Sequence, residues 1–198
     1  MNTLEKLFGS PLKVRLMKLF LFHVSMVFEI EEIKSRTQAP VPKIRKELQI
    51  LESIGFLKKK TFSEPGKKTA KKKRTGWQLD QSFPYLLSLQ SMLVYTNPFT
   101  GKEIAKKFKN CGDIKVLIVS GIFIQDWESR VDLLVVGDKF KKGTLQSVIK
   151  TLEADMGCEL RYTLLETDDF EYRLNIYDKL IRDVLDFPHQ KIVNKLGI

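Results

Sequence analysis

The sequence predicts an α+β protein built from two parts of different composition. Residues 1–112 hold 22 basic and 9 acidic residues, a net charge of +13, whereas residues 113–198 hold 12 basic and 15 acidic residues, a net charge of −3. Helical spacing of apolar residues dominates the first part, and β-like apolar runs alternate with helical patterns in the second. With 198 residues, 43% of them hydrophobic, the chain is long enough for two small cores.

The first part begins with three predicted helices. Ser10 and Pro11 mark the start of the first, because a hydroxyl caps free N–H groups and proline suits the first turn. The second is expected over residues 29–36, after a short strand that contains Phe28 and Ile30. The third opens at a proline and ends at a glycine. It is expected to begin at Pro42 and to end at Gly55. Its expected buried stripe consists of Ile44, Leu48, Leu51 and Ile54.

A run of basic residues follows the third helix. Between residues 58 and 75 the chain holds nine basic residues and one acid, Glu64, and a short β-like segment follows at 77–79. A helix, a glycine stop, a strand, a basic tip and a returning strand form a winged helix. A basic wing beside a recognition helix suits a polyanion, so double-stranded DNA is the expected partner. For the run taken alone, a solvated loop is the alternative.

The expected DNA-contacting residues come from the turn, the third helix and the wing. Basic residues near the start of a recognition helix reach base edges and phosphates, and wing lysines contact phosphates. An ordinary basic helix surface is the alternative for the helix residues. The full set is Gln38, Lys43, Arg45, Lys46, Lys58, Lys59, Lys60, Lys67, Lys68, Lys71, Lys72, Lys73 and Arg74.

A linking region over residues 83–100 is expected to join a domain over 1–82 to a domain over 101–198. A helix at 83–95 carries more apolar surface than a plain linker needs. Winged-helix repressors commonly read two half-sites through two-fold symmetry. A homodimer is therefore expected.

The C-terminal domain alternates strands and helices. Strands are expected at 114–119, 130–136 and 159–165, and helices at 101–109, 143–156 and 168–187. The last helix is long enough to contain a bend and places Tyr177 on its inward face, and a short basic tail closes the chain. This alternation indicates a small α/β domain, for which we expect a mixed sheet.

Residues 119–138 resemble the minimal nucleotidyltransferase fold, with the sequence VSGIFIQDWESRVDLLVVGD. In that fold a Gly-Ser pair ending one strand holds triphosphate, an Asp-x-Asp opening the next strand holds Mg²⁺, and a neighbouring strand adds a third carboxylate. In this chain Ser120 and Gly121 stand in reversed order, Arg130 occupies the first Asp position, Asp132 matches the second, and Glu159 corresponds to the third.

The replacement of one carboxylate by arginine removes a metal ligand. No catalytic residue, metal or cofactor is therefore expected, and the five residues form a candidate ligand pocket instead. Arg130 is expected to pair with Asp132, with Arg161 as the alternative partner of that carboxylate. The arginine face of such a pocket suits a nucleotide or another anionic small molecule as effector.

Nearly the whole chain is similar to prokaryotic proteins that join a winged helix-turn-helix regulator, as in ArsR- and MarR-like repressors, to a nucleotidyltransferase-like domain. The segments that carry the likeness are LEKLFGSPLKVRLMKLFLF, IRKELQILESIGFLKKK and SRVDLLVVGD. The resemblance implies a DNA-binding transcriptional regulator with an inactive nucleotidyltransferase-like sensor or assembly domain. One alternative is an enzyme that transfers a nucleotidyl group to a protein or small molecule, and another is a winged helix that contacts protein or RNA.

Cysteine usage and the N-terminus indicate a cytoplasmic protein. Two cysteines are too few for a disulfide framework, and the first residues lack the pattern of a signal peptide. The apolar run at 16–28 contains Lys18 and His23 and is too short to span a bilayer, so no membrane association is expected.

Overall fold

The computed structural model describes residues 3–63 and 73–198. Helices and a β-hairpin come first along the chain, and a four-stranded mixed sheet with further helices follows, which confirms the predicted mixed α+β class. No helix within these two ranges has both the length and the apolar character needed to cross a membrane.

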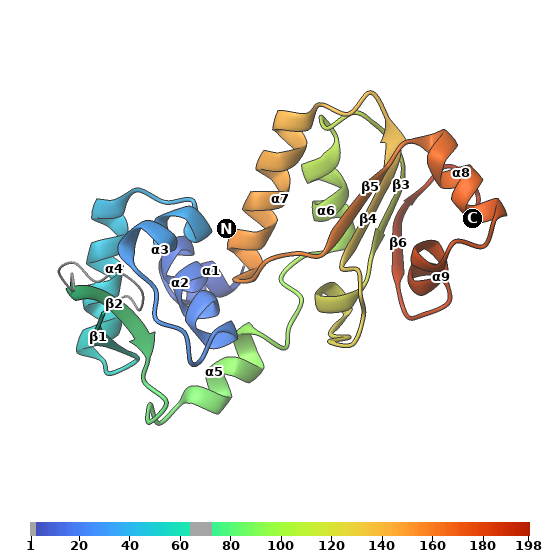
Figure 1. Ribbon diagram of the computed structural model, residues 1–198. Coiled ribbons are helices and arrows are strands. Elements are labelled where there is room, and N and C mark those ends of the chain that lie inside the picture. Colours follow the sequence, from blue (N-terminus) through green and yellow to red (C-terminus); the bar gives the residue numbers. More distant parts are fainter. Residues whose placement is uncertain (1–2, 64–72) are drawn as a thin grey trace. The chain divides into compact units, whose positions relative to one another are not determined.

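The chain divides into two compact units (Figure 1). The first unit comprises Met1–Tyr95 and Thr151–Cys158, and the second comprises Thr96–Lys150 and Glu159–Ile198. The chain therefore leaves the first unit after Tyr95 and returns to it for eight residues before completing the second.

Local sequence signals determine where the first helices begin and end. The Ser10 hydroxyl accepts a hydrogen bond from the Lys13 N–H at 3.2 Å, which confirms the predicted cap. Gly55 follows the fourth helix with a φ of +78°, a left-handed conformation that glycine adopts without strain. The helices are α1 (Thr3–Leu7), α2 (Pro11–Phe22), α3 (Ile30–Thr37) and α4 (Val41–Ser53).

The core of the first unit includes the predicted apolar stripe of α4. Ile44, Leu48 and Leu51 are buried, as the helical spacing predicted. The prediction for Ile54 was wrong, because α4 ends at Ser53 and the Ile54 side chain is 55% exposed.

An antiparallel hairpin follows α4. It is formed by β1 (Leu57–Ser63) and β2 (Lys73–Leu79), with Leu57 opposite Leu79. In place of the short strand predicted to contain Phe28 and Ile30, Phe28 alone forms an isolated bridge with Trp77, and Ile30 begins α3. The expected basic tip lies outside the described residues.

The linking helix is shorter than predicted. Helix α5 spans Leu86–Leu93 and belongs to the first unit, where Leu93 is buried. Leu87 on the same helix is 78% exposed, and Tyr85 just before it is 66% exposed. This helix therefore presents apolar surface to the exterior of its unit.

A charged side chain is buried inside the first unit. Lys18 of α2 is 2% exposed, and its Nζ donates a hydrogen bond to the Asp155 carbonyl oxygen at 3.0 Å. Burial lowers the pKa of Lys18 from 10.5 to about 8, against the opposing charges of Asp155 and Glu5. Arg15 donates to the Asp155 carboxylate at 2.9 Å.

The second unit is organised around a mixed sheet in the order β5-β4-β3-β6. Strands β4 and β5 are parallel, and the other two pairs are antiparallel. The segment predicted as a basic tail forms β6 at the edge of the sheet, and the strand predicted at 130–136 begins three residues later. The bounds are β3 (Asp113–Val119), β4 (Leu133–Asp138), β5 (Tyr162–Leu165) and β6 (Gln190–Asn194).

Helices cover both faces of this sheet (Figure 1). The helix predicted at 168–187 is broken near Tyr177, which has a φ of +55° and is 78% exposed, so its predicted inward position was wrong. Phe170, Ile181 and Val184 from the two resulting helices pack in one core with residues of β3 and β4. The helical segments are α6 (Gly101–Phe108), the 3₁₀ helix η1 (Gly121–Ile124), α7 (Lys142–Met156), α8 (Thr167–Asn175) and α9 (Lys179–Leu185).

Candidate functional site

The first candidate site is the exposed face of α4. Lys43, Arg45 and Lys46 are all exposed, in the first half of the helix, as the spacing predicted. Across the described ranges, none of these three cations is engaged in an ion pair. Gln38 is exposed between α3 and α4 with a φ of +54°, and its side-chain amide donates to the Ser35 carbonyl oxygen. The turn and helix residues therefore present donors and positive charge to solvent.

The cations at the base of the hairpin differ from those of α4. Lys58 pairs with Asp80 at 3.2 Å, Lys59 pairs with Glu52 at 3.0 Å, and Arg74 pairs with Glu29 at 3.0 Å. The sequence reading counted these cations as charge available to DNA. In the unbound chain, folding brings each of them to a carboxylate from outside the basic run.

The rest of the basic run is only partly visible. Lys60 is exposed and has no ion pair within the part of the chain that the structure describes. Lys73 begins β2, and its side chain is not described. The other predicted wing lysines, Lys67, Lys68, Lys71 and Lys72, lie outside the described residues.

A hollow of about 350 Å³ lies between α4 and the hairpin. Arg45, Gln49 and Glu52 line it from α4, four and three residues apart. Thr75 and Trp77 line it from β2, and Lys59 and Ile30 complete it. Gln49 was not among the residues predicted from the sequence. It lies four residues after Arg45, which places both side chains on one helix face.

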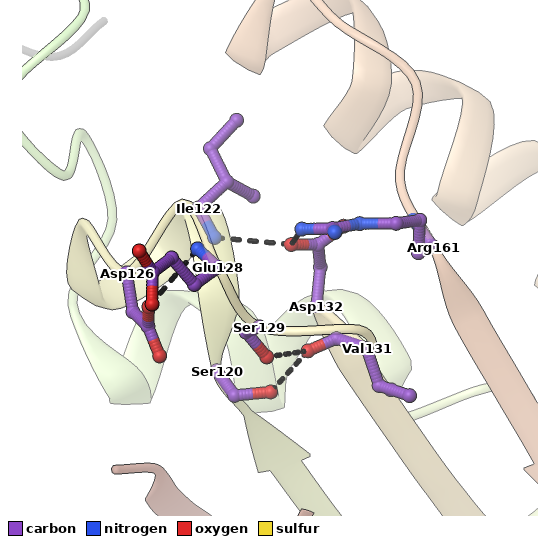
Figure 2. Close-up of polar contacts among 8 residues, drawn as sticks. All are labelled: Ser120, Ile122, Asp126, Glu128, Ser129, Val131, Asp132 and Arg161. Carbon is purple, nitrogen blue, oxygen red and sulfur yellow. Dashed lines mark hydrogen bonds and ion pairs between the residues drawn. The ribbon is translucent and has the colours of Figure 1, made fainter. Parts of the chain in front are cut away.

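The second candidate site lies where β3 ends and β4 begins. The Ser120 N–H donates to the Asp132 carbonyl oxygen at 2.9 Å, so these two predicted pocket residues are neighbours. The Ser120 hydroxyl donates to the Val131 carbonyl oxygen, as does the Ser129 hydroxyl at 2.8 Å (Figure 2). Ser120 is 2% exposed, so its hydroxyl is not presented to a ligand as the resemblance implied.

The Asp132 carboxylate is buried and fully hydrogen-bonded. Its Oδ1 accepts from the Ile122 N–H at 3.0 Å and from Arg161 Nη2 at 2.8 Å. Its Oδ2 accepts from the Arg161 N–H and Arg161 Nε, both at 2.9 Å. Figure 2 shows the Arg161 side chain beside this carboxylate. The side chain is 2% exposed. Four donors therefore occupy the oxygens that a metal ion would need.

The predicted pairing of Arg130 with Asp132 was wrong. Arg130 is 68% exposed and pairs with Asp183 at 3.1 Å. Leu133 pairs with Tyr162 in the parallel register, so Arg161 and not Glu159 lies beside Asp132. Glu159 is exposed, three residues ahead of β5. In the described ranges, no group of three His, Cys, Asp or Glu side chains is placed to hold a metal ion.

Gly121 permits the close approach of η1 to the buried carboxylate. Its φ is +54°, and a Cβ at this position would lie 2.0 Å from Asp132 Oδ1. Gly121→Ala is therefore expected to lower the free energy of unfolding by about 3 kcal/mol, through backbone strain and displacement of a hydrogen-bonded carboxylate.

A matched control for this substitution is Gly143→Ala in α7. A Cβ at Gly143 would meet nothing within 4 Å, and alanine favours helix, so this variant is expected to be neutral or slightly stabilised. Urea denaturation of both variants provides the measurement. Equal stability of the two variants would contradict the structural role assigned to Gly121.

A cavity of about 470 Å³ lies next to this cluster in the second unit. Asp126, Glu128 and Asp183 contribute carboxylates to its wall, Arg130 contributes the single guanidinium of the lining, and Ser129, Phe187 and Pro188 complete it. An anion would meet a net negative lining here. The charge balance therefore offers little support for the anionic effector that the sequence suggested.

Comparison of the chain with protein-family models, with curated proteins and with solved structures gave no match. The function must therefore be inferred from the chemistry of the two candidate sites.

Proposed function

We propose that the chain is a DNA-binding transcriptional regulator. In this proposal the first unit is a winged helix-turn-helix, with α4 as the recognition helix and the β1–β2 hairpin as the wing. The order α3, turn, α4, hairpin supports it. So does the exposure of Lys43, Arg45 and Lys46 in the first half of α4, the half that enters the major groove in this motif.

The observation that carries the proposal is the contrast between two groups of cations. The α4 cations make no ion pair in the described structure, whereas Lys58, Lys59 and Arg74 at the hairpin base are each paired with a carboxylate. Free cations gain most from phosphate contacts, because no internal pair has to be broken first. Of these two groups, the α4 cations should therefore contribute more to DNA affinity.

The second unit completes the proposal as a non-catalytic, nucleotidyltransferase-like module for sensing or assembly. Ser120 and Asp132 lie at facing ends of adjacent strands, as the resemblance implies. The four hydrogen bonds to the Asp132 carboxylate favour a structural role for that residue. The alternative of nucleotidyl transfer has no comparable support from the geometry.

The test of the DNA-binding proposal is the triple variant Lys43→Gln/Arg45→Gln/Lys46→Gln. We expect it to bind duplex DNA roughly 100-fold more weakly at low salt, and the slope of log K against log salt to shrink by about 3. For the unmodified chain, contact with ~5 phosphates predicts a slope near −4 to −5. Fluorescence anisotropy across a salt series measures both quantities.

The matched control removes three cations from the hairpin base: Lys58→Gln/Lys59→Gln/Arg74→Gln. It changes the net charge equally, but its affinity for DNA is expected to change by less than about fivefold, because these cations are already paired. A larger loss in this control than in the α4 variant would overturn the assignment of α4 as the recognition helix.

The proposed regulator is a homodimer assembled through α5. Leu87 and Tyr85 supply exposed apolar surface, and two-fold symmetry matches palindromic operators. Sedimentation at tens of micromolar is expected to give a dimer, and Leu87→Lys is expected to give a monomer. A monomeric unmodified chain that binds DNA at full affinity would contradict this prediction.

A further inference from the structure

Five lysines from two separate segments gather at one end of the second unit. Lys106 and Lys109 lie at the end of α6, Lys139 and Lys141 follow β4, and Lys142 begins α7. All five are exposed. They are called here the α6–α7 lysine cluster.

Backbone contacts bring the two segments together. The Lys141 N–H donates to the Cys111 carbonyl oxygen at 2.8 Å. A Cβ on Gly112 would lie 2.8 Å from the Asp138 carbonyl oxygen and 3.0 Å from that of Lys139. Figure 1 shows the end of α6 and the start of α7 at the same end of the sheet, where β3 begins and β4 ends. The cluster is therefore a product of the fold and not of a single basic run.

The positive charge of the cluster is not compensated nearby. Over residues 3–63 and 73–198, none of the five lysines makes an ion pair. The nearest acids along the chain have other partners. Glu103 accepts from the Thr100 hydroxyl at 2.9 Å, Asp113 pairs with Lys115 at 2.7 Å and Lys195 at 3.4 Å, and Asp138 accepts from the Thr167 hydroxyl at 2.9 Å. The second unit, which contains most of the net negative residues 113–198, thus carries a local basic surface.

The surface around the cluster also lacks fully exposed large apolar side chains, and Phe140, between Lys139 and Lys141, is half-buried. None of the exposed large hydrophobic residues in the described chain falls within 101–110 or 139–142. A membrane-binding surface would combine its lysines with Trp, Phe or Leu side chains that enter the lipid. Lysines without fully exposed apolar neighbours suit a regular array of phosphates, which they contact as flexible point charges.

We propose that the α6–α7 lysine cluster is a second contact surface for the phosphate backbone of duplex DNA, in addition to α4. Such contacts carry no sequence information, because phosphates are the same at every base pair. The second unit thereby adds affinity to the chain without adding specificity. The sequence alone had assigned this half a role apart from DNA.

The test uses the full chain with the variant Lys109→Gln/Lys141→Gln. Binding to a 40-base-pair operator duplex and to a shuffled duplex of equal length is expected to weaken by the same factor, about tenfold, with the salt slope reduced by about 2. The matched control Lys150→Gln/Lys179→Gln removes two exposed lysines from elsewhere in the same unit and is expected to stay within about twofold of the parent.

The outcomes separate this proposal from that for α4. Parental affinity in the Lys109→Gln/Lys141→Gln variant overturns the second surface and leaves the α4 variant to decide the proposed function. If the cluster variant loses DNA affinity while the α4 variant keeps parental affinity, the second surface is supported and the assignment of α4 as the recognition helix is overturned. The parent chain could instead bind phosphatidylserine vesicles, with the cluster variant losing that binding and keeping its DNA affinity. This result would assign the cluster to a membrane and overturn the proposal.

Discussion

Replacing Arg161 with methionine is expected to lower the free energy of unfolding by about 3 kcal/mol, because it leaves a buried carboxylate without its charged partner. Asp132 would keep the two backbone donors, Ile122 N–H and the N–H of residue 161, but would lose both guanidinium bonds. Arg161 itself is half exposed, which keeps the expected cost at the lower end for a broken buried pair. Urea denaturation followed by circular dichroism measures the change.

The matched control is Arg130→Met. Arg130 is also paired with a carboxylate in the second unit, but it is 68% exposed, so its removal is expected to cost less than about 1 kcal/mol. The double variant Arg161→Met/Asp132→Ala should be more stable than Arg161→Met alone, because it no longer buries an unpaired charge. A double variant no more stable than the single variant would show that Asp132 contributes through packing alone.

Raising the pH from 8 to 10.5 is expected to strengthen the fold relative to a Lys18→Met variant. Burial lowers the pKa of Lys18 to about 8 in the folded chain, from 10.5. Between these two values the unfolded chain binds the proton that the folded chain has released, so stability rises with pH. Over this range the free energy of unfolding rises by roughly 3 kcal/mol. Below pH 8 the same amount is the cost of burying the charged Lys18 in the folded chain.

Lys18→Met removes that penalty at neutral pH. Methionine retains most of the lysine volume without the buried charge, so the variant is expected to be more stable than the parent by about 1–3 kcal/mol at pH 7. The gain should vanish toward pH 10.5. The measurement is the difference between the two free energies of unfolding across the pH series, which cancels the other titrating groups. A difference that stays constant with pH would refute the assigned role of Lys18.

The sequence was most informative where structure depends on near neighbours. The Ser10 cap, the glycine after α4 and the stripe of Ile44, Leu48 and Leu51 were predictable, because each follows from contacts within one or two helical turns. The same periodicity placed the exposed cations of α4. Segment β6 was missed because it is an edge strand with no buried residue, and its composition resembles that of a tail.

The errors in the candidate sites have a common physical origin. The partner of Asp132 is 29 residues away, at Arg161, and Arg130 meets a carboxylate 53 residues away, at Asp183. Lys58 likewise meets Asp80 across 22 residues. The sequence favoured ion pairs between residues close along the chain, such as Arg130 and Asp132. Strand register places Arg161 beside Asp132, and the position of α9 places Asp183 beside Arg130, neither of which can be read from charge spacing alone.

The return of the chain to the first unit at Thr151–Cys158 limits how the protein can be divided. Helix α7 begins in the second unit and ends in the first, where a Cβ on Gly157 would lie 2.6 Å from the Lys18 Cβ. A fragment cut after Tyr95 would lack this helix end and would leave the Lys18 ammonium without its Asp155 acceptor. A single cut in the chain therefore cannot separate the two units from each other.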